Sequence, residues 1–202
     1  MRTGHTTMKL FGHSQVYGLR GVIPLIERMH ATYWKAIDPE REDAQTIAAL
    51  GTKLVVRHNI GFDTHNPGAF FNSCRRQGWY EFAWAVETPN EPMPAWEQER
   101  ILAYSEFESA CVRLFKRDGK ECIVNNMGSG NNGHYVEGAT YYGAHDYGWP
   151  QLLSQRGVHA LLYRIWFTRD ILQRNPQAKL FITECGVTEA VVLANIPPGT
   201  DY

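Results

Sequence analysis

The chain has 202 residues, 44% hydrophobic and 20% charged, a balance that predicts a globular protein with one substantial core rather than a disordered chain. Its 20 basic and 21 acidic side chains are mixed along the sequence, with a formal net charge of -1, so nucleic acid and anionic membranes are not expected partners. No stretch approaches the ~20 apolar residues of a membrane span.

Short apolar runs alternate with longer stretches of helical character, which is typical of parallel βα units. Seven strands are predicted, at residues 16–19, 32–37, 53–59, 81–87, 121–126, 140–145 and 179–183. Helices are predicted at 40–50, 68–77, 95–117 and 150–175, the last with a break at Gly157. In 95–117, apolar residues recur at three-to-four spacing, and Asp118-Gly119 supplies a stop.

Seven such units can form either an open doubly wound sheet or most of an eight-stranded barrel. The doubly wound sheet normally carries a glycine-rich phosphate turn near its first strand, and this sequence has none there. Gly128-Ser129-Gly130 follows the fifth strand and lacks the nucleotide-binding spacing. The predicted fold is therefore α/β, of the (β/α)8 TIM-barrel type, with about seven of the eight strands present in a single domain spanning residues 1–202.

Two glutamates follow predicted strands of this barrel. Glu91 lies in Thr88-Pro89-Asn90-Glu91-Pro92, after the fourth strand, and Glu184 lies at the end of the seventh. Active sites of barrel enzymes form at the carboxyl ends of the strands. Strands four and seven lie on opposite sides of such a ring, so the two carboxylates can face each other across its mouth. Either could instead be an exposed carboxylate, and Glu91 before Pro92 also suits a helix start.

Asn90-Glu91-Pro92 and Thr183-Glu184-x-Gly186 resemble the acid/base and nucleophile motifs of retaining glycoside hydrolases of the clan A type, which are (β/α)8 barrels. The resemblance implies hydrolysis of O-glycosidic bonds in an oligosaccharide, polysaccharide or glycoside. It implies that Glu91 is the acid/base, that Glu184 is the nucleophile, and that Asn90 contacts the sugar 2-hydroxyl. No cofactor is implied.

Further candidates for substrate binding follow other strands: His58 after the third, Asn126 after the fifth, and His145, Tyr147 and Trp149 after the sixth. Strand alternation turns only one of Arg57 and His58 inward, and His58 is preferred. Each candidate could instead have a purely structural role: a histidine could cap a helix or lie satisfied in the core, an asparagine could form a turn, and a tryptophan could pack in the core. Glu87 is expected inside the fourth strand as a supporting residue.

Two other functional classes stay open. One is a carbohydrate-binding barrel, or an inactive fragment, without chemistry. The other is a metal-dependent amidohydrolase-like barrel, although the spacing of His58, Asp63 and His65 fits no zinc signature, so no metal site is predicted. No Gly-x-Ser-x-Gly elbow is present.

The four cysteines lie mostly among apolar neighbours without Cys-x-x-Cys spacing, as free buried thiols do. No signal peptide is visible, and a cytoplasmic location is favoured. After residue 183 the sequence offers no candidate for an eighth strand, so we expect a barrel that is incomplete at its C-terminus. The oligomeric state is not predicted.

Overall fold

The structure is a computed structural model that describes residues 11–14, 19–60, 66–89, 98–126, 134–148 and 171–187. Of residues 11–14, 98–100, 144–148 and 182–187, only the backbone is described.

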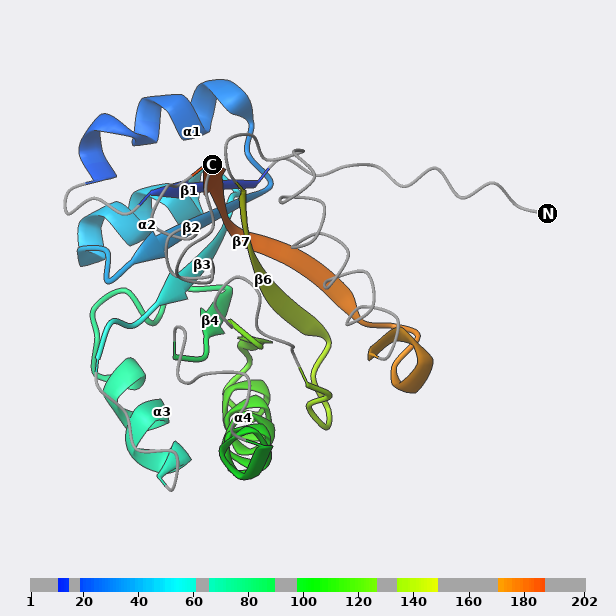
Figure 1. Cartoon of the computed structure of the whole chain (residues 1–202). Helices are drawn as coiled ribbons and strands as arrows, with labels where there is room; N and C mark the ends of the chain where they lie inside the picture. Colours follow the sequence, from blue (N-terminus) through cyan, green and yellow to red (C-terminus); the bar gives the residue numbers. More distant parts are fainter. Residues whose placement is uncertain are drawn as a thin grey trace, which may run out of the picture.

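Seven strands form one parallel sheet: β1 (Phe11–Ser14), β2 (Tyr33–Ile37), β3 (Lys53–Arg57), β4 (Ala85–Glu87), β5 (Glu121–Val124), β6 (Tyr141–Gly148) and β7 (Lys179–Val187). Each strand pairs in parallel with the next along the chain, and the sheet curves (Figure 1). A doubly wound sheet reverses its strand order at a switch point, and this sheet does not. The predicted TIM-barrel type of fold, with seven strands, is confirmed.

Helices follow most strands on the outside of the curve (Figure 1): α1 (Ile23–Met29), α2 (Arg41–Ala49), α3 (Pro67–Arg75) and α4 (Gln98–Arg117), with a 3-10 turn at Leu19–Gly21. Local chemistry sets their ends. The Asn66 side chain accepts a hydrogen bond from Ala69 N–H at 2.9 Å, and Pro67 fits the first turn of α3. After α4, Gly119 takes the left-handed conformation, with φ of 76°, that ends a helix.

The sequence-based prediction is wrong in two places. The first strand lies at Phe11–Ser14 rather than at 16–19, and Leu19 begins the 3-10 turn instead. Helix α1 was not predicted, because its seven residues include Pro24 and carry too few turns to show a helical period. Of the predicted helix at 150–175, only residues 171–175 are described; 171–174 are helical and Asn175 is not.

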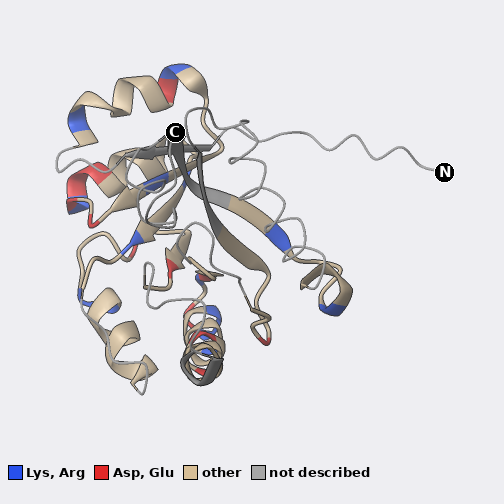
Figure 2. Ribbon diagram, viewed as in Figure 1, with Lys and Arg blue, Asp and Glu red and all other residues tan. Residues whose placement is uncertain are grey.

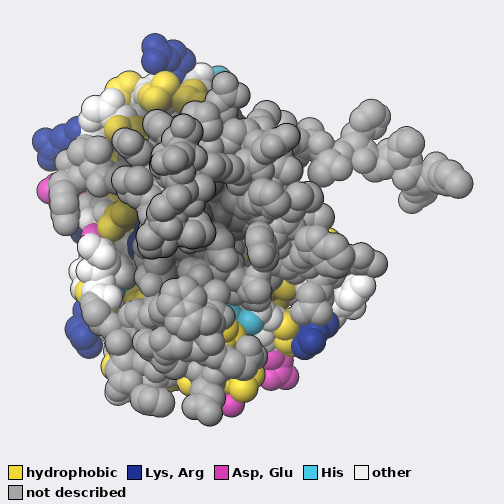
Figure 3. Space-filling view, in the orientation of Figure 1, with side chains coloured by type: hydrophobic (Ala, Val, Ile, Leu, Met, Phe, Trp, Pro, Cys, Tyr) yellow, Lys and Arg dark blue, Asp and Glu magenta, His cyan; other side chains and the backbone are white. Residues whose placement is uncertain are grey.

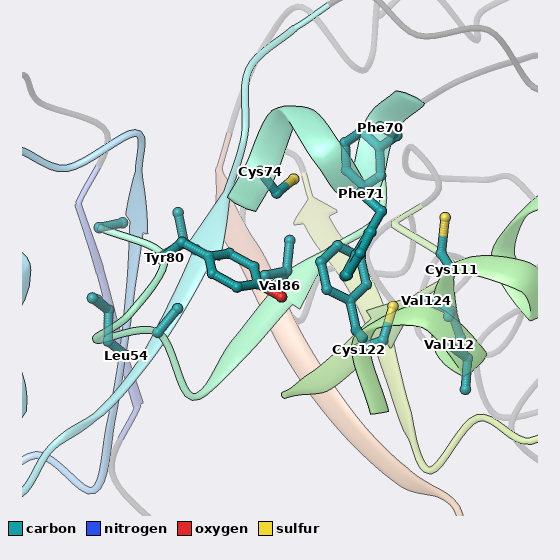
Figure 4. Packing of buried hydrophobic residues seen from close by; sticks show 14 of the residues in the cluster. Leu54, Phe70, Phe71, Cys74, Tyr80, Val86, Cys111, Val112, Cys122 and Val124 are labelled. Carbon is teal, nitrogen blue, oxygen red and sulfur yellow. The ribbon is translucent and has the colours of Figure 1, made fainter. Parts of the chain in front are cut away.

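The main hydrophobic core lies between the outer face of the sheet and the helices. Phe70, Phe71 and Cys74 of α3 and Cys111 of α4 belong to one cluster over the strands (Figure 4). The rings of Phe70 and Phe71 also contact Phe115 of α4. The rings of Phe71 and Phe115 pack edge to face at 5.2 Å. Three cysteines, Cys74, Cys111 and Cys122, are free thiols buried in this layer, where burial raises the pKa of each.

The inner face of the sheet carries a second, smaller cluster made of strand residues alone: Val55, Ala85, Ile123 and Tyr141. Four aromatic rings, those of Tyr33, Trp84, Tyr141 and Phe181, contact one another with centroids 5.0–6.2 Å apart. Lys53 lies over the Trp84 ring at 4.8 Å and Lys179 over Tyr141 at 5.4 Å. Lys53, Lys179, Tyr33 and Tyr141 begin their strands, so the aromatic rings fill the amino-terminal end of the inner face.

Basic and acidic residues are interspersed along the described helices and strands (Figure 2). Hydrophobic side chains reach the surface over α1, where Leu25 and Met29 are exposed (Figure 3). No helix in the described ranges is long and apolar enough to cross a membrane.

Candidate functional site

A buried ion cluster lies on the inner face toward the carboxyl ends of β2, β3 and β4. Glu87 Oε2 lies 2.9 Å from Lys35 Nζ and accepts a hydrogen bond from Arg57 Nε at 3.1 Å. The side chains of Lys35 and Glu87 have no exposed surface, and that of Arg57 is 5% exposed. The backbone register brings these three side chains together. Arg57 pairs with Glu87, and Lys35 pairs with Val55, which is the inward-facing residue of β3 that precedes Arg57.

Asn126 extends this polar edge beyond β5. Its Nδ2 donates to the carbonyl oxygens of Thr88 at 3.2 Å and Ile123 at 3.3 Å, and the residue is fully buried. The side chain lies against Gly143 of β6, where an added Cβ would overlap Asn126 Oδ1. A glycine at 143 therefore makes room for the asparagine, which the structure places at the end of the barrel where it was expected.

A second buried carboxylate, Glu108 of α4, fixes the loop ends behind this edge. Its Oε1 accepts hydrogen bonds from Thr88 Oγ1–H at 2.6 Å and Asn125 N–H at 2.7 Å. Its Oε2 lies 2.7 Å from His134 Nε2. Thr88 follows β4 and Asn125 follows β5, so one helix residue holds the carboxyl ends of two neighbouring strands in place.

His58 does not lie on the inner face, and the preference for it over Arg57 is corrected. Its ring packs against Trp79 at 5.8 Å, and its two nitrogens contact Asp38 and Ser73 of α3 on the helix side of the sheet. Arg57 takes the inward position. The sequence gives two polar residues in a row, and alternation alone does not decide which of them faces inward.

Asp38 lies at the end of β2 and binds the histidine. Burial raises the pKa of its carboxyl, but the hydrogen bonds with His58 and with Asn59 N–H lower it, and the net result is a pKa below the ordinary 3.8. The carboxylate is therefore the stable form near neutral pH.

The backbone of β6 and β7 brings His145 and Glu184 into register as direct partners, next to a shift in register between Ala144 and His145. Tyr147 pairs with Gly186. These three candidates are thus placed on adjacent strands, by backbone alone. Asn90, Glu91 and Trp149 lie outside the described ranges, so the opposition of Glu91 and Glu184 across the barrel mouth stays a prediction.

Sequence analysis missed Lys35 and Asp38 and undervalued Glu87. One signal was available: Lys35 interrupts the apolar run Tyr33-Trp34-Lys35-Ala36-Ile37, and a charge inside a buried strand requires a buried partner. Asp38 had no comparable signal, because an aspartate after a strand is also ordinary turn chemistry.

The part of the chain that the structure describes contains no group of three or more His, Cys, Asp or Glu side chains arranged to hold a metal ion. The inner polar edge carries two cations, one carboxylate and one amide, groups that donate and accept hydrogen bonds.

Comparisons with known proteins return only solved structures. No protein family model matches, and no curated protein matches. Alanine racemase from Clostridium difficile 630 matches with 11% identity and a TM-score of 0.44, over 93% of this chain and 48% of that one. Its complex with cycloserine matches with 14% identity and a TM-score of 0.41, over 90% and 48%. The chain thus spans about half the length of these structures.

These findings correct the expected family. Both structures named above are alanine racemases, no family model matches, and the assignment to clan A glycoside hydrolases, with its glycosidase activity, is withdrawn. The motifs behind it are short. Asn-Glu-Pro and Thr-Glu-x-Gly occupy seven positions, and strand ends rich in Asn, Glu and Pro arise in any barrel from turn and helix-start chemistry. At 11–14% identity, the racemases in turn say nothing about what this chain binds.

Replacing Glu87 with Gln should lower the free energy of unfolding by about 3–5 kcal/mol, because it removes the buried charge that Lys35 and Arg57 share. Urea unfolding followed by circular dichroism measures the change. Glu81→Gln is the matched control: it breaks the ion pair with Arg41, whose two side chains are 52% and 58% exposed, and should cost less than about 1 kcal/mol. Equal changes in the free energy of unfolding would show that the inner ion cluster stabilises the fold no more than an exposed ion pair does.

Replacing Gly143 with Ala should cost about 1–3 kcal/mol, because the new Cβ displaces the Asn126 side chain from its buried hydrogen bonds. Gly21→Ala is the control, since no atom lies within 4 Å of its added Cβ. Thermal unfolding compares the two variants. A Gly143→Ala protein as stable as the wild type would contradict the close packing of Asn126.

Asp38 should make stability depend on pH in the acid range. Because the folded state lowers its pKa, its contribution is complete above the ordinary value of 3.8 and is lost as the pH falls through the lower, folded value. The difference in unfolding free energy between the wild type and Asp38→Asn should therefore be largest near neutral pH and shrink below about pH 4. Urea titrations from pH 7 to pH 2.5 test this, and a difference independent of pH would refute it.

Proposed function

We propose that the inner face at the carboxyl ends of the strands binds a carbohydrate, and that Glu91 and Glu184 exchange protons with it. The observation that carries this proposal is the polarity of the inner face. Aromatic rings fill its amino-terminal end, whereas Lys35, Arg57, Glu87 and Asn126 lie buried toward the other. Burying charges and amides is costly, and barrel enzymes accept that cost at the carboxyl ends, where their ligands bind.

A polyhydroxylated ligand suits this set of groups. Carboxylate and amide oxygens accept hydrogen bonds from sugar hydroxyls, while amide, guanidinium and ammonium groups donate to them. Because Glu87 offsets part of the charge of Lys35 and Arg57, the edge favours a neutral polar ligand over a strongly anionic one. Within this proposal, Asn90, His145, Tyr147, Asn126 and Trp149 are the remaining contacts, and His58 is excluded by its position on the helix side.

Glu91 and Glu184 supply the proposed acid–base groups. A carboxyl group at the rim of a buried face can transfer a proton when burial and neighbours bring its pKa toward the working pH. The support for Glu184 is its backbone register beside His145 on the neighbouring strand. The support for Glu91 is its sequence position three residues after Thr88, which Glu108 holds at the end of β4.

Saturation-transfer difference NMR with a panel of neutral mono- and disaccharides tests the proposal, with Kd values from calorimetry for each sugar that binds. Asn126→Ala should weaken binding up to about tenfold, the effect of losing one hydrogen bond of ~1.4 kcal/mol. Glu137→Gln, an exposed change, should leave Kd unaltered.

Proton exchange is read separately, from the NMR spectrum of the bound sugar in D2O over hours. Glu91→Gln and Glu184→Gln should each abolish any time-dependent change in that spectrum while binding persists. Absence of saturation transfer to every sugar in the panel would refute the proposal. Binding without any spectral change in the wild type would reduce it to a carbohydrate-binding barrel.

A further inference from the structure

A hydrogen-bonded chain of Asp, His and Ser joins three elements on the helix side of the sheet. His58 Nδ1 lies 2.6 Å from Asp38 Oδ1, and His58 Nε2 lies 3.1 Å from Ser73 Oγ. Asp38 follows β2, His58 follows β3, and Ser73 lies in α3, so the three residues come together only in the folded chain. Both distances fall in the range expected between a nucleophile, its base and the group that orients the base.

The direction of the protons in this chain follows from the charge on Asp38. An ionised carboxylate can only accept, so His58 Nδ1 must carry a proton and donate it to Asp38 Oδ1. In the neutral imidazole, Nε2 then has a free lone pair. The Ser73 hydroxyl therefore donates to His58 Nε2, and this is the orientation in which the imidazole can remove the serine proton.

Asp38 is fixed in position by two further features. Its second oxygen, Oδ2, accepts a hydrogen bond from Asn59 N–H at 2.8 Å. Its backbone adopts φ of 38°, a left-handed conformation that is strained for a residue with a side chain and that recurs at functional sites. The carboxylate is thereby aimed at His58 by the backbone of β2 and β3 rather than by a mobile loop.

His58 and Ser73 differ in solvent exposure as a base and a nucleophile should: the base is shielded from water, and the nucleophile is more exposed. His58 is 6% exposed and packs under the Trp79 ring, which shields the base from water. Ser73 is half-buried, so it is more exposed than His58. The Gln77 side-chain amide, one helical turn further on, donates to the Ser73 backbone carbonyl at 3.3 Å.

We propose that Ser73 is a nucleophile toward small activated acyl esters, with His58 as its base and Asp38 as the residue that positions His58. This site lies on the opposite face of the sheet from the proposed carbohydrate site, so neither proposal depends on the other. Nothing in the sequence pattern pointed to it, since Ser73 lies inside a helix and outside any Gly-x-Ser-x-Gly elbow.

The reaction balances without a further reagent. Ser73 Oγ forms a bond to the ester carbonyl carbon while its proton passes to His58 Nε2. The bond from that carbon to the alcohol oxygen then breaks, and the alcohol leaves with the proton from His58. Water attacks the acyl-serine, giving up a proton to His58, and the carboxylic acid is released as Ser73 regains its hydrogen.

Labelling with a fluorophosphonate tests the nucleophile, because the reagent forms a stable bond to an activated serine that peptide mass spectrometry locates. We expect modification at Ser73, with loss of fluoride, in the wild type and none at that position in Ser73→Ala. Ser105→Ala is the matched control, since Ser105 is a half-buried helix serine that donates to the Tyr135 carbonyl and has no histidine partner among the described residues. No labelling of the wild type, or labelling at another residue only, would refute the proposal.

Two more variants separate reactivity from structure. Ser73→Cys should be alkylated by iodoacetamide at least about tenfold faster than Ser105→Cys, because His58 can deprotonate only the first thiol. Asp38→Asn should slow fluorophosphonate labelling by about 10²-fold or more. It should also remove the downfield proton resonance of His58 Nδ1–H. If the three residues had only a structural role, the loss of this resonance would not be accompanied by slower labelling. Equal alkylation rates for the two cysteine variants would overturn the assignment of His58 as base.

Discussion

The inner face of this barrel depends on one constraint: Glu87 must neutralise the charge that β2 and β3 bring into a buried space. Lys35 and Arg57 come from neighbouring strands, and both reach the same carboxylate oxygen at 2.9 and 3.1 Å. The strands cannot slide by one residue without turning these charges onto the helix-packed core. The cluster therefore fixes register as well as charge, and it divides the inner face into an aromatic end and a polar end.

Glu108 does on the outer side what Glu87 does on the inner side. It lies in α4 and accepts hydrogen bonds from groups that follow β4 and β5. Two buried carboxylates thus act at the end of β4 from opposite faces: Glu87 joins it to β2 and β3 through side-chain cations, and Glu108 joins it to β5 through a hydroxyl and a backbone amide. Loops that follow such fixed ends can carry precisely placed groups, because the positions from which they start do not vary.

The sequence predicted the fold well and the site only in part. Strand periodicity and strand order are local and repeated properties, so strands β2 to β7 and helices α2 to α4 fall close to their predicted positions. The site depends on which of two adjacent residues faces inward and on contacts between distant elements. Arg57 and His58 show the difficulty, since both are polar, both are buried, and only the partners Glu87 and Ser73, 30 and 15 residues away, distinguish their roles.

That same pair of neighbours explains how one strand end can serve two faces. Alternation places Arg57 in the ion cluster and His58 beside α3. The end of β3 therefore contributes one side chain to the polar arrangement on each face of the sheet. The inner arrangement is buried, and its two cations share one carboxylate oxygen, which suits rigid support of a ligand site. The outer one ends in a half-buried hydroxyl, Ser73 Oγ, which lies 3.1 Å from a nitrogen of the shielded His58 imidazole. A contact that only joined α3 to the sheet would need the hydrogen bond between Ser73 and His58 alone. The hydrogen bond between His58 and Asp38 is additional, and Asp38 makes it from a strained backbone conformation, a cost that packing alone does not explain.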